Sequence, residues 1–399
     1  MFKREFCRLP KRDKKSLSYS ILMSKKGMPR ADEVMIAEAE RKTLAALTTP
    51  PPPLPDAKIL EGRRGRFVLD KEEMCHQLRR TVRELFATEE FTIEQMVEPF
   101  FPSTSANYIR SRGKLGAVGF IYDYFMKDLI RQELLDFRYL PVECVGQQSR
   151  SFGPLREAEQ ELLDAAFEKG DEEAYSTIGV HMDTKRFRTS WSSLYWKLYK
   201  YALTEEPLVE PVGLAEALKI RVISKGPPAL YTVLKPLQKF MWGVLKKHSI
   251  FELIGSPASE ETIMKCIGDI GQWEDEIIIS GDYKSSTDCL HSWVSETLAK
   301  ELARVLRLNG QFSTSLEEML IRSLTGHIFV DGDGFKFPQR EGQLMGSITS
   351  FPFLCLANAA MCRWAMEEAG GRNLRLSDRR TTVNGKLAPL RVNGDDCVF

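Results

Sequence analysis

The sequence predicts a protein of the α/β (α+β) class, mostly helical in its first half and mixed in its second half. Its 399 residues, 43% of them hydrophobic, can bury a core large enough for two or three lobes. A helical stripe of apolar side chains runs through the second half, at Leu290, Val294, Leu298, Leu302 and Leu306. From Pro211 onward, short apolar runs alternate with Gly-containing turns, which is the pattern of strands joined by hairpins.

Charge and cysteine usage narrow the class of protein. The formal net charge is only +1, so affinity for nucleic acid has to come from local basic clusters. One such cluster is the first 30 residues, which hold ten Lys and Arg against two acidic residues. The eight cysteines form no CxxC pair and have no nearby histidines at zinc spacing, which favours a reduced protein inside the cell.

Residues 1–55 are predicted to form a basic head and a Pro-rich linker. The head lacks the apolar core of a secretory signal, and Glu5 and Asp13 argue against a mitochondrial presequence, which remains an alternative. A helix is expected over DEVMIAEAERKTLAAL, and TTPPPPLP ends it because consecutive prolines make a stiff extended spacer. Whether the whole segment is ordered stays open.

Residues 56–210 are predicted as a mostly helical region, with amphipathic stretches such as KEEMCHQLRRTVRELF and ELLDAAFEKGDEEAYSTI. Between them, PSTSANYIRSRGKLGAVGF carries small residues and a basic run at Arg110, Arg112 and Lys114. A loop of this kind suits the phosphate backbone of a nucleic acid. A solvated basic turn explains the same residues equally well.

Residues 211–275 hold a second basic element. In LKIRVISKGPP, the period-two spacing of a strand puts Lys219 and Arg221 on one face, with Lys225 just beyond. Three cations on one strand can bind the phosphates of a nucleotide. A plain solvated strand face is the alternative.

Residues 276–399 hold the acidic groups. Asp282 follows the apolar strand EIIIS, and Asp288 comes six residues later at an expected helix start, where it can also act as an N-cap. Asp395 and Asp396 follow Gly394 in a turn between two short apolar runs, which taken alone is ordinary hairpin chemistry. Three convergent carboxylates need a cation, however, and Mg²⁺ is the expected one, with Mn²⁺ as the alternative.

The stretch EGQLMGSITSFPFLCLAN combines a pliant loop with a helix. Gly346 gives the loop freedom, and the hydroxyls of Ser347 and Ser350 lie beside a helix that Pro352 opens. They suit contacts to a sugar or a phosphate backbone, although by themselves they would only cap a helix. The apolar run SFPFLCLANAAMCRW is too interrupted to span a membrane and predicts a buried helix.

Two further hairpins are expected in this half. HIFVDGDGFKFP predicts strands around a Gly-rich turn, and a calcium loop is rejected because its twelfth position is Gly342, where a Glu is required. RRTTVNGKLAPL predicts strands around an Asn-Gly turn.

Four of these stretches stand in a fixed order: LKIRVISKGPP, GDYKSSTD, GQLMGSITSFPFLCLAN and NGDD. They resemble motifs F, A, B and C of viral RNA-dependent RNA polymerases, and most of all those of the botourmiavirus (ourmia-like) group. PSTSANYIRSRGKLGAVG resembles a stretch upstream of the palm in the same group, so the resemblance covers about residues 100 to 399.

The resemblance implies a right-hand polymerase, with residues 56–210 and 211–275 contributing to the fingers and 276–399 forming the palm and inserted fingers. The implied reaction is template-directed transfer of a ribonucleoside monophosphate from an NTP to a 3'-hydroxyl, by two-metal catalysis, in viral genome replication and transcription. RNA template, RNA product and NTPs are the implied partners, and the host cytoplasm is the implied location.

The same resemblance implies roles for single residues. Metal binding and catalysis are expected of Asp282, Asp395 and Asp396. The nucleotide is expected to be bound by Lys219, Arg221, Lys225, Asp288, Ser350 and Asn358. Contacts to RNA are expected from Arg110, Arg112, Lys114, Gly346 and Ser347.

Two departures from the family pattern affect these expectations. Many such enzymes place an Asn four residues after a motif-B Thr, but here positions 353 and 354 are Phe and Leu, and Asn358 lies one helical turn further on. The family also continues with motifs D and E and a thumb, which nothing in this chain matches. The chain looks truncated just after motif C; a second polypeptide or a C-terminal segment is expected to supply these parts, and the chain alone is expected to be nearly inactive.

Two rival functions remain. A reverse transcriptase shares the chemistry, but such enzymes usually place an aromatic residue before the paired aspartates, where this chain has Gly394, and Asp288 offers an acceptor to a 2'-hydroxyl. A non-catalytic RNA-binding fragment that needs a second polypeptide is the other alternative. The retained Asp282, Asp395 and Asp396 argue against it.

Overall fold

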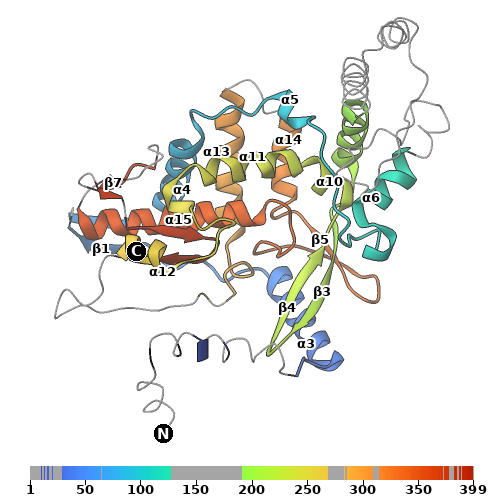
Figure 1. Cartoon of the computed structure of the whole chain (residues 1–399), viewed down its shortest axis with the longest axis horizontal. Coiled ribbons are helices and arrows are strands. Elements are labelled where there is room, and N and C mark those ends of the chain that lie inside the picture. Colours follow the sequence, from blue (N-terminus) through green and yellow to red (C-terminus); the bar gives the residue numbers. More distant parts are fainter. Residues whose placement is uncertain are drawn as a thin grey trace, which may run out of the picture.

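The computed structural model describes residues 29–126, 191–267, 283–376 and 382–398, except positions 64, 284, 309–313, 372, 384–385 and 388, together with a few single residues before position 29. In this part of the chain, most helices gather in one body, and several small sheets lie beside it (Figure 1). The mixed α/β class predicted from the sequence is confirmed.

The α-helices of the described chain are α3 Glu33–Thr48, α4 Lys71–Phe86, α5 Ile93–Met96, α6 Gly116–Ile121, α10 Pro228–Val233, α11 Lys235–Lys246, α12 Glu260–Ile267, α13 Ser292–Leu308, α14 Thr314–Arg322 and α15 Ser350–Gly370. The strands are β1 Lys58–Gly62, β2 Gly65–Leu69, β3 Leu208–Glu216, β4 Lys219–Lys225, β5 Ile328–Val330, β6 Lys336–Pro338, β7 Thr382–Val383, β8 Lys386–Leu387, β9 Arg391–Asn393 and β10 Asp396–Val398.

The four-stranded sheet has the order β4-β3-β5-β6. β3 and β4 form a long antiparallel hairpin, whose pairs run from Glu210 with Lys225 to Glu216 with Lys219. β3 pairs in parallel with β5, and β5 forms the predicted hairpin with β6. Helix α3 covers this sheet, since Leu47 packs in one apolar cluster with residues of β3, β5 and the loop after β6.

The main core gathers around α15, which Figure 1 shows crossing the molecule in red below α4, α13 and α11. The helix is apolar on nearly all sides, and this explains its burial along most of its length. It ends at Gly371, whose φ of +69° is a left-handed C-cap. The predicted buried helix is thus confirmed, and none of the helices described is long and apolar enough to cross a bilayer.

The predicted stripe is confirmed for Leu298, Leu302 and Leu306, which are fully buried on α13, whereas Val294 is half-buried and Leu290 precedes the helix. The helix begins at Ser292, four residues after Asp288. Its Ser292 N–H donates to the carboxylate of Glu341 over 3.2 Å. A side chain from a distant loop therefore takes the capping position that the sequence offered to Asp288.

Local turn chemistry predicted most hairpins but not all. β7 and β8 pair antiparallel on either side of the predicted Asn-Gly turn, which itself lies outside the described residues, and Gly394 lies in the turn between β9 and β10, as expected. The β1–β2 hairpin, in contrast, lies in a region predicted as helix and loop. Most of its residues are exposed, so it lacks the alternation of buried and polar residues that marks a strand. The predicted strand EIIIS and helix ELLDAAFEKGDEEAYSTI fall outside the described residues.

Candidate active site

Loop 341–349, which lies in the third motif, touches two of the others. The carbonyl of its Met345 accepts a 2.9 Å hydrogen bond from the N–H of Ser224 in β4. The N–H of its Gln343 donates over 2.9 Å to the carbonyl of Thr287, which lies in the second motif between Asp282 and Asp288. The basic strand and the acidic turn therefore flank one loop.

Two glycines allow this close packing. An added Cβ at Gly342 would lie 2.7 Å from the carbonyl oxygen of Asp288, and one at Gly346 would lie 2.6 Å from that of Ser224. Both glycines also have positive φ, +77° and +125°. Any other residue would be strained at these positions and would push the neighbouring segments away. The glycine expected to contact RNA, Gly346, is thus required by the fold itself.

Of the paired aspartates, Asp395 lies in the turn between β9 and β10, and Asp396 is the first residue of β10. Asp396 pairs with Asn393 in the strand register, and Gly394 has a φ of +71°, in the left-handed region that favours glycine. The side chain of Asp395 is half-buried and that of Asp396 is exposed. Neither aspartate is fully buried, so this end of the hairpin is open to solvent.

The segment around the second motif approaches this turn. The hydroxyl of Ser286 donates a 2.6 Å hydrogen bond to Oδ2 of Asp395. Burial raises the pKa of Tyr283, and the nearby thiols and the Asp395 carboxylate add to that shift. Asp282, which directly precedes Tyr283, lies outside the described residues. Its predicted approach to Asp395 therefore stays a prediction.

The turn suits a hard cation in its chemistry. Asp395 and Asp396 offer carboxylate oxygens, which Mg²⁺ prefers, and Mg²⁺ is usually held by one or two carboxylates together with waters and substrate phosphates. Within the described ranges no three His, Cys, Asp or Glu side chains form a cluster that could hold a metal. A complete ligand set would therefore need a group from outside these ranges or from the substrate.

Asp288 lies at the junction of the turn and the loop. Its carboxylate accepts a 3.2 Å hydrogen bond from the hydroxyl of Thr287, and burial raises its pKa. The side chain is half-buried. The N–H of Ser292 at the start of α13 donates to Glu341, which takes the capping role that was the alternative for Asp288.

The hydroxyls expected to contact nucleotide or RNA are engaged inside the protein. Ser350 donates over 2.9 Å to the side-chain oxygen of Gln343, whose amide group donates over 2.7 Å to Ser295. Ser347 donates to the carbonyl of Ser323. Both hydroxyls are buried, which makes them supports of the loop in this structure.

Asn358 projects from α15 toward the paired aspartates. Its amide nitrogen lies 3.0 Å from the carbonyl oxygen of Gly394, 2.8 Å from that of Asp395 and 3.4 Å from that of Asp396. The side chain is 7% exposed. The sequence comparison with family motifs suggested a sugar contact, and only the tertiary structure reveals these backbone contacts.

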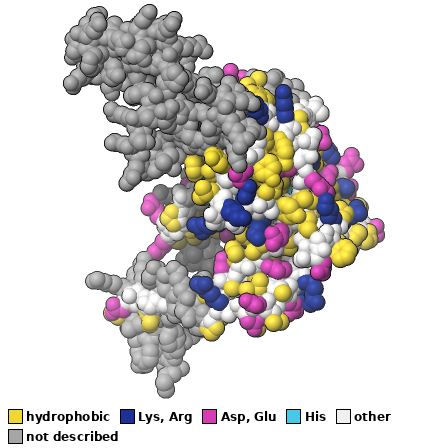
Figure 2. All heavy atoms as spheres, turned by 90° about the vertical axis from the view of Figure 1, so that its right-hand side faces the viewer, with side chains coloured by type: hydrophobic (Ala, Val, Ile, Leu, Met, Phe, Trp, Pro, Cys, Tyr) yellow, Lys and Arg dark blue, Asp and Glu magenta, His cyan; other side chains and the backbone are white. Residues whose placement is uncertain are grey.

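The basic residues of β4 have acidic partners on β3. Lys225 lies 3.2 Å from the carboxylate of Glu210, and Arg221 lies 3.3 Å from that of Glu216. Lys219 is exposed at the end of the hairpin. Figure 2 shows the face to the right of Figure 1, where Lys and Arg are interspersed with Asp and Glu. A polyphosphate would have to replace these carboxylates.

The basic loop of the first half adjoins the end of β4. Tyr108 N–H donates over 3.0 Å to the carbonyl of Gly226, directly after that strand. Arg110 is paired with Asp123, whereas Arg112 and Lys114 are exposed. Of the three cations in this run, the latter two are thus the ones open to a phosphate backbone.

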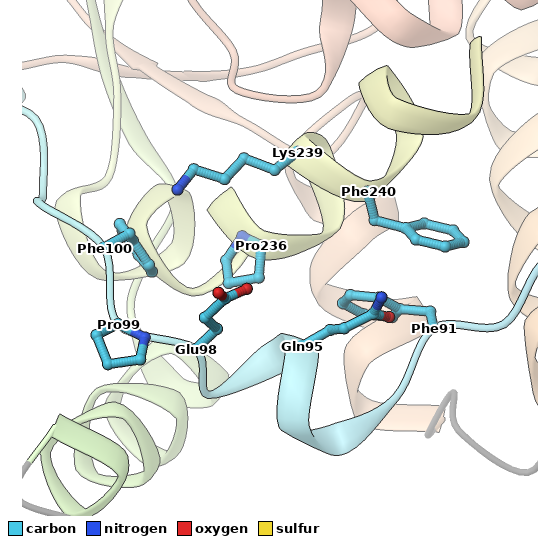
Figure 3. Close-up of a pocket in the computed structure, with 8 residues that line it drawn as sticks. All are labelled: Phe91, Gln95, Glu98, Pro99, Phe100, Pro236, Lys239 and Phe240. Atoms are coloured by element: carbon cyan, nitrogen blue, oxygen red, sulfur yellow. The ribbon is translucent and has the colours of Figure 1, made fainter. Parts of the chain in front are cut away.

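A surface pocket lies away from these residues, between α5 with the segment after it and α11 (Figure 3). Its volume of about 210 Å³ is below the roughly 300–1,000 Å³ of typical small-molecule sites. It is lined by Phe91, Gln95, Glu98, Pro99, Phe100, Pro236, Lys239 and Phe240. None of the predicted site residues lines it, so we do not assign the nucleotide to it.

Comparison with known proteins agrees with the motifs. The chain is 26% identical, over 380 residues, to the RNA-dependent RNA polymerase of Ourmia melon virus (isolate Melon/Iran/VE9). The matched region covers 87% of this chain and 38% of that protein, so the chain spans less than two-fifths of the length of the curated relative it matches. No protein-family model matches the chain. The predicted resemblance to a viral RNA-dependent RNA polymerase of the ourmia-like group is therefore confirmed.

Proposed function

We propose that this chain is an RNA-dependent RNA polymerase of right-hand architecture, with fingers and palm, that transfers ribonucleoside monophosphates from NTPs to a 3'-hydroxyl. Its role would be the replication and transcription of a viral genome in the host cytoplasm. The observation that carries the proposal is the hydrogen-bonded meeting of β4, turn 285–290 and loop 341–349, with Ser286 reaching Asp395. The 26% identity to a viral polymerase supports the same reaction.

The basic residues of β4 and the acidic residues near Gly394 would bind different parts of a metal-bound nucleoside triphosphate. Lys219, Arg221 and Lys225 form the cationic side, and a triphosphate that displaced their acidic partners would gain charge-assisted hydrogen bonds. Asp395 and Asp396 would form the acidic side together with Asp282 and would hold Mg²⁺ or Mn²⁺. When bound, such ions neutralise phosphate charge and lower the pKa of an attacking hydroxyl.

The nearby groups would orient the remaining parts of the substrates. Asp288, half-buried and close to the loop, offers an acceptor for the ribose 2'-hydroxyl. Arg112 and Lys114 are exposed beside the end of β4 and would hold the RNA phosphate backbone. A reverse-transcriptase-like enzyme or a non-catalytic RNA-binding fragment would use the same surface, and the test below separates them.

The test measures nucleotide incorporation on a primed RNA template with Mg²⁺ or Mn²⁺, using the chain together with the C-terminal polymerase segment expected to complete it, and the Asp395→Asn variant of the same protein. Loss of one metal-binding charge, worth several kcal/mol of stabilisation, should lower synthesis by about 1,000-fold. The matched control is Asp333→Asn, which alters an exposed carboxylate in the turn between β5 and β6. A preference for deoxynucleotides would favour the reverse-transcriptase alternative.

A binding measurement makes the test independent of turnover. Mn²⁺ is titrated by electron paramagnetic resonance, with and without NTP, into the same three proteins. We expect the Asp395→Asn variant to bind Mn²⁺·NTP at least tenfold more weakly than the chain and the Asp333→Asn control. Equal binding by all three proteins, or equal synthesis where synthesis occurs, would contradict the proposed site.

A further inference from the structure

The turn that carries the paired aspartates is held by a single amide side chain. The amide nitrogen of Asn358 carries two protons and lies 3.0 Å from the carbonyl oxygen of Gly394, 2.8 Å from that of Asp395 and 3.4 Å from that of Asp396. Three consecutive carbonyls therefore face one donor group. No amide proton is left over for a nucleotide sugar.

The orientation of this amide is determined by its other neighbour. The thiol of Cys362, one helical turn further along α15, lies 3.3 Å from Oδ1 of Asn358 and can donate to it. If the amide were flipped, its oxygen would face the three carbonyl oxygens and repel them. The amide nitrogen therefore faces the turn and the amide oxygen faces the Cys362 thiol.

Two more residues of α15, Cys355 and Phe351, pack against the turn at Gly394. The N–H of Gly394 donates over 3.2 Å to the sulfur of Cys355, and burial raises the pKa of this thiol to about 12, so it stays neutral. A Cβ at Gly394 would lie 3.2 Å from the ring of Phe351. Residues 351, 355 and 358 are spaced i, i+4 and i+7, which places them on one face of the helix.

We propose that Asn358, assisted by Cys355, is a positioning residue that holds the backbone of the turn and thereby sets where the Asp395 and Asp396 carboxylates lie. The inference rests on the proposed function for its consequence in catalysis. Its structural part stands separately, because adjacent carboxylates repel each other and tend to open a turn. Donor groups on the backbone carbonyls hold the turn closed without neutralising the carboxylates.

The first test measures the turn itself and needs no catalysis. Hydrogen exchange is followed in peptides that cover residues 389–398, in the unaltered chain and in Asn358→Ala. Loss of two hydrogen bonds should speed exchange of the turn amides by about 10- to 100-fold. Asn373→Ala is the matched control, since it makes the same change at an exposed position after α15 and should leave exchange unaltered.

A second variant covers the case in which Asn358→Ala fails to fold. Cys355→Ala removes only the acceptor of the Gly394 N–H and should speed exchange of that amide by about threefold to tenfold, as expected for one weak hydrogen bond. Unaltered exchange of the turn in a folded Asn358→Ala or Cys355→Ala variant would overturn the inference.

The final test separates positioning from sugar recognition. Asn358→Ala should lower kcat for ribonucleotides and deoxynucleotides by the same factor, whereas Asp288→Ala should alter their ratio. A selective loss of ribonucleotide incorporation in Asn358→Ala would make it a sugar contact and overturn the proposal. If even the unaltered chain showed no synthesis and no Mn²⁺·NTP binding, the proposed function would fail while the exchange result still decided the role of Asn358.

Discussion

The turn at Gly394 and the β3–β4 hairpin carry the acidic and basic halves of the candidate site, and the protein holds them in different ways. The turn is fixed by buried groups of α15, since Asn358 and Cys355 bond to its backbone. The cations of β4 are held by half-exposed ion pairs, such as Lys225 with Glu210. Acidic groups are thus preorganised, while basic groups stay free to change partners.

The difference follows from what each half binds. Two like charges beside each other need a rigid backbone to stay in place until a cation arrives. Long cationic side chains on a regular hairpin can instead exchange a carboxylate for a phosphate with little loss, because exposed ion pairs contribute only about 0.2–1 kcal/mol. Three perturbations would break or sharpen this contrast.

The largest effect is expected where α15 is anchored to α4. The carboxylate of Glu367, which is 1% exposed, accepts hydrogen bonds from both terminal nitrogens of Arg80, with N···O distances of 2.8 and 2.9 Å. Glu367→Gln would remove a buried negative charge from the half-buried guanidinium of Arg80, which keeps only its pair with Glu84, and should lower the free energy of unfolding by about 3 kcal/mol in urea denaturation. Glu296→Gln, in the exposed pair with Lys300, should change it by less than about 0.5 kcal/mol. If both variants lost the same free energy of unfolding, the Glu367–Arg80 pair would not anchor α15 to α4 more strongly than an exposed ion pair does.

A smaller, pH-dependent effect is expected at the base of the β3–β4 hairpin. Glu205 accepts the N–H groups of Ala229 at 3.1 Å and Leu230 at 2.6 Å, which closes the hairpin where α10 begins. Burial outweighs these bonds and raises the pKa of Glu205 from 4.5 to about 7. A raised carboxyl pKa means that the folded state binds the proton more tightly, so this stabilisation is full below pH 4.5 and is lost as pH rises through 7.

The free energy of unfolding of the unaltered chain should therefore fall by about 2–3 kcal/mol between pH 5 and 8 through Glu205 alone. In Glu205→Gln this part of the fall should disappear, as measured by urea denaturation. Glu206→Gln is the control, because this neighbour is exposed and pairs with Lys336. Parallel pH profiles for the chain and Glu205→Gln would show that Glu205 does not titrate in this range.

The smallest effect is expected at the ion pairs of the hairpin. Replacing Glu210 and Glu216 by Gln frees Lys225 and Arg221, yet should change the unfolding free energy by less than about 1 kcal/mol. Binding of inorganic triphosphate should strengthen by about twofold to threefold and depend more steeply on salt. Weaker binding would mean that the carboxylates orient the cations instead of competing for them.

Several elements could be predicted from local sequence alone. Asn-Gly and Gly-Asp turns placed two hairpins, and the spacing of leucines in α13 placed a buried face. These signals are local because turn geometry and helix periodicity depend on neighbouring residues. The β1–β2 hairpin was missed for the same reason, since its exposed strands carry no such pattern.

The candidate site also has features that the local sequence determines and features that depend on tertiary packing. The sequence by itself determined the order of the four motifs, the charges they carry and their resemblance to viral polymerases. Only the tertiary structure decided that Ser286 bonds to Asp395, that Glu341 caps α13 and that Asn358 faces the backbone of the turn. These contacts join segments 36 or more residues apart. Their partners depend on how whole helices pack, and side-chain type along the chain does not specify that packing.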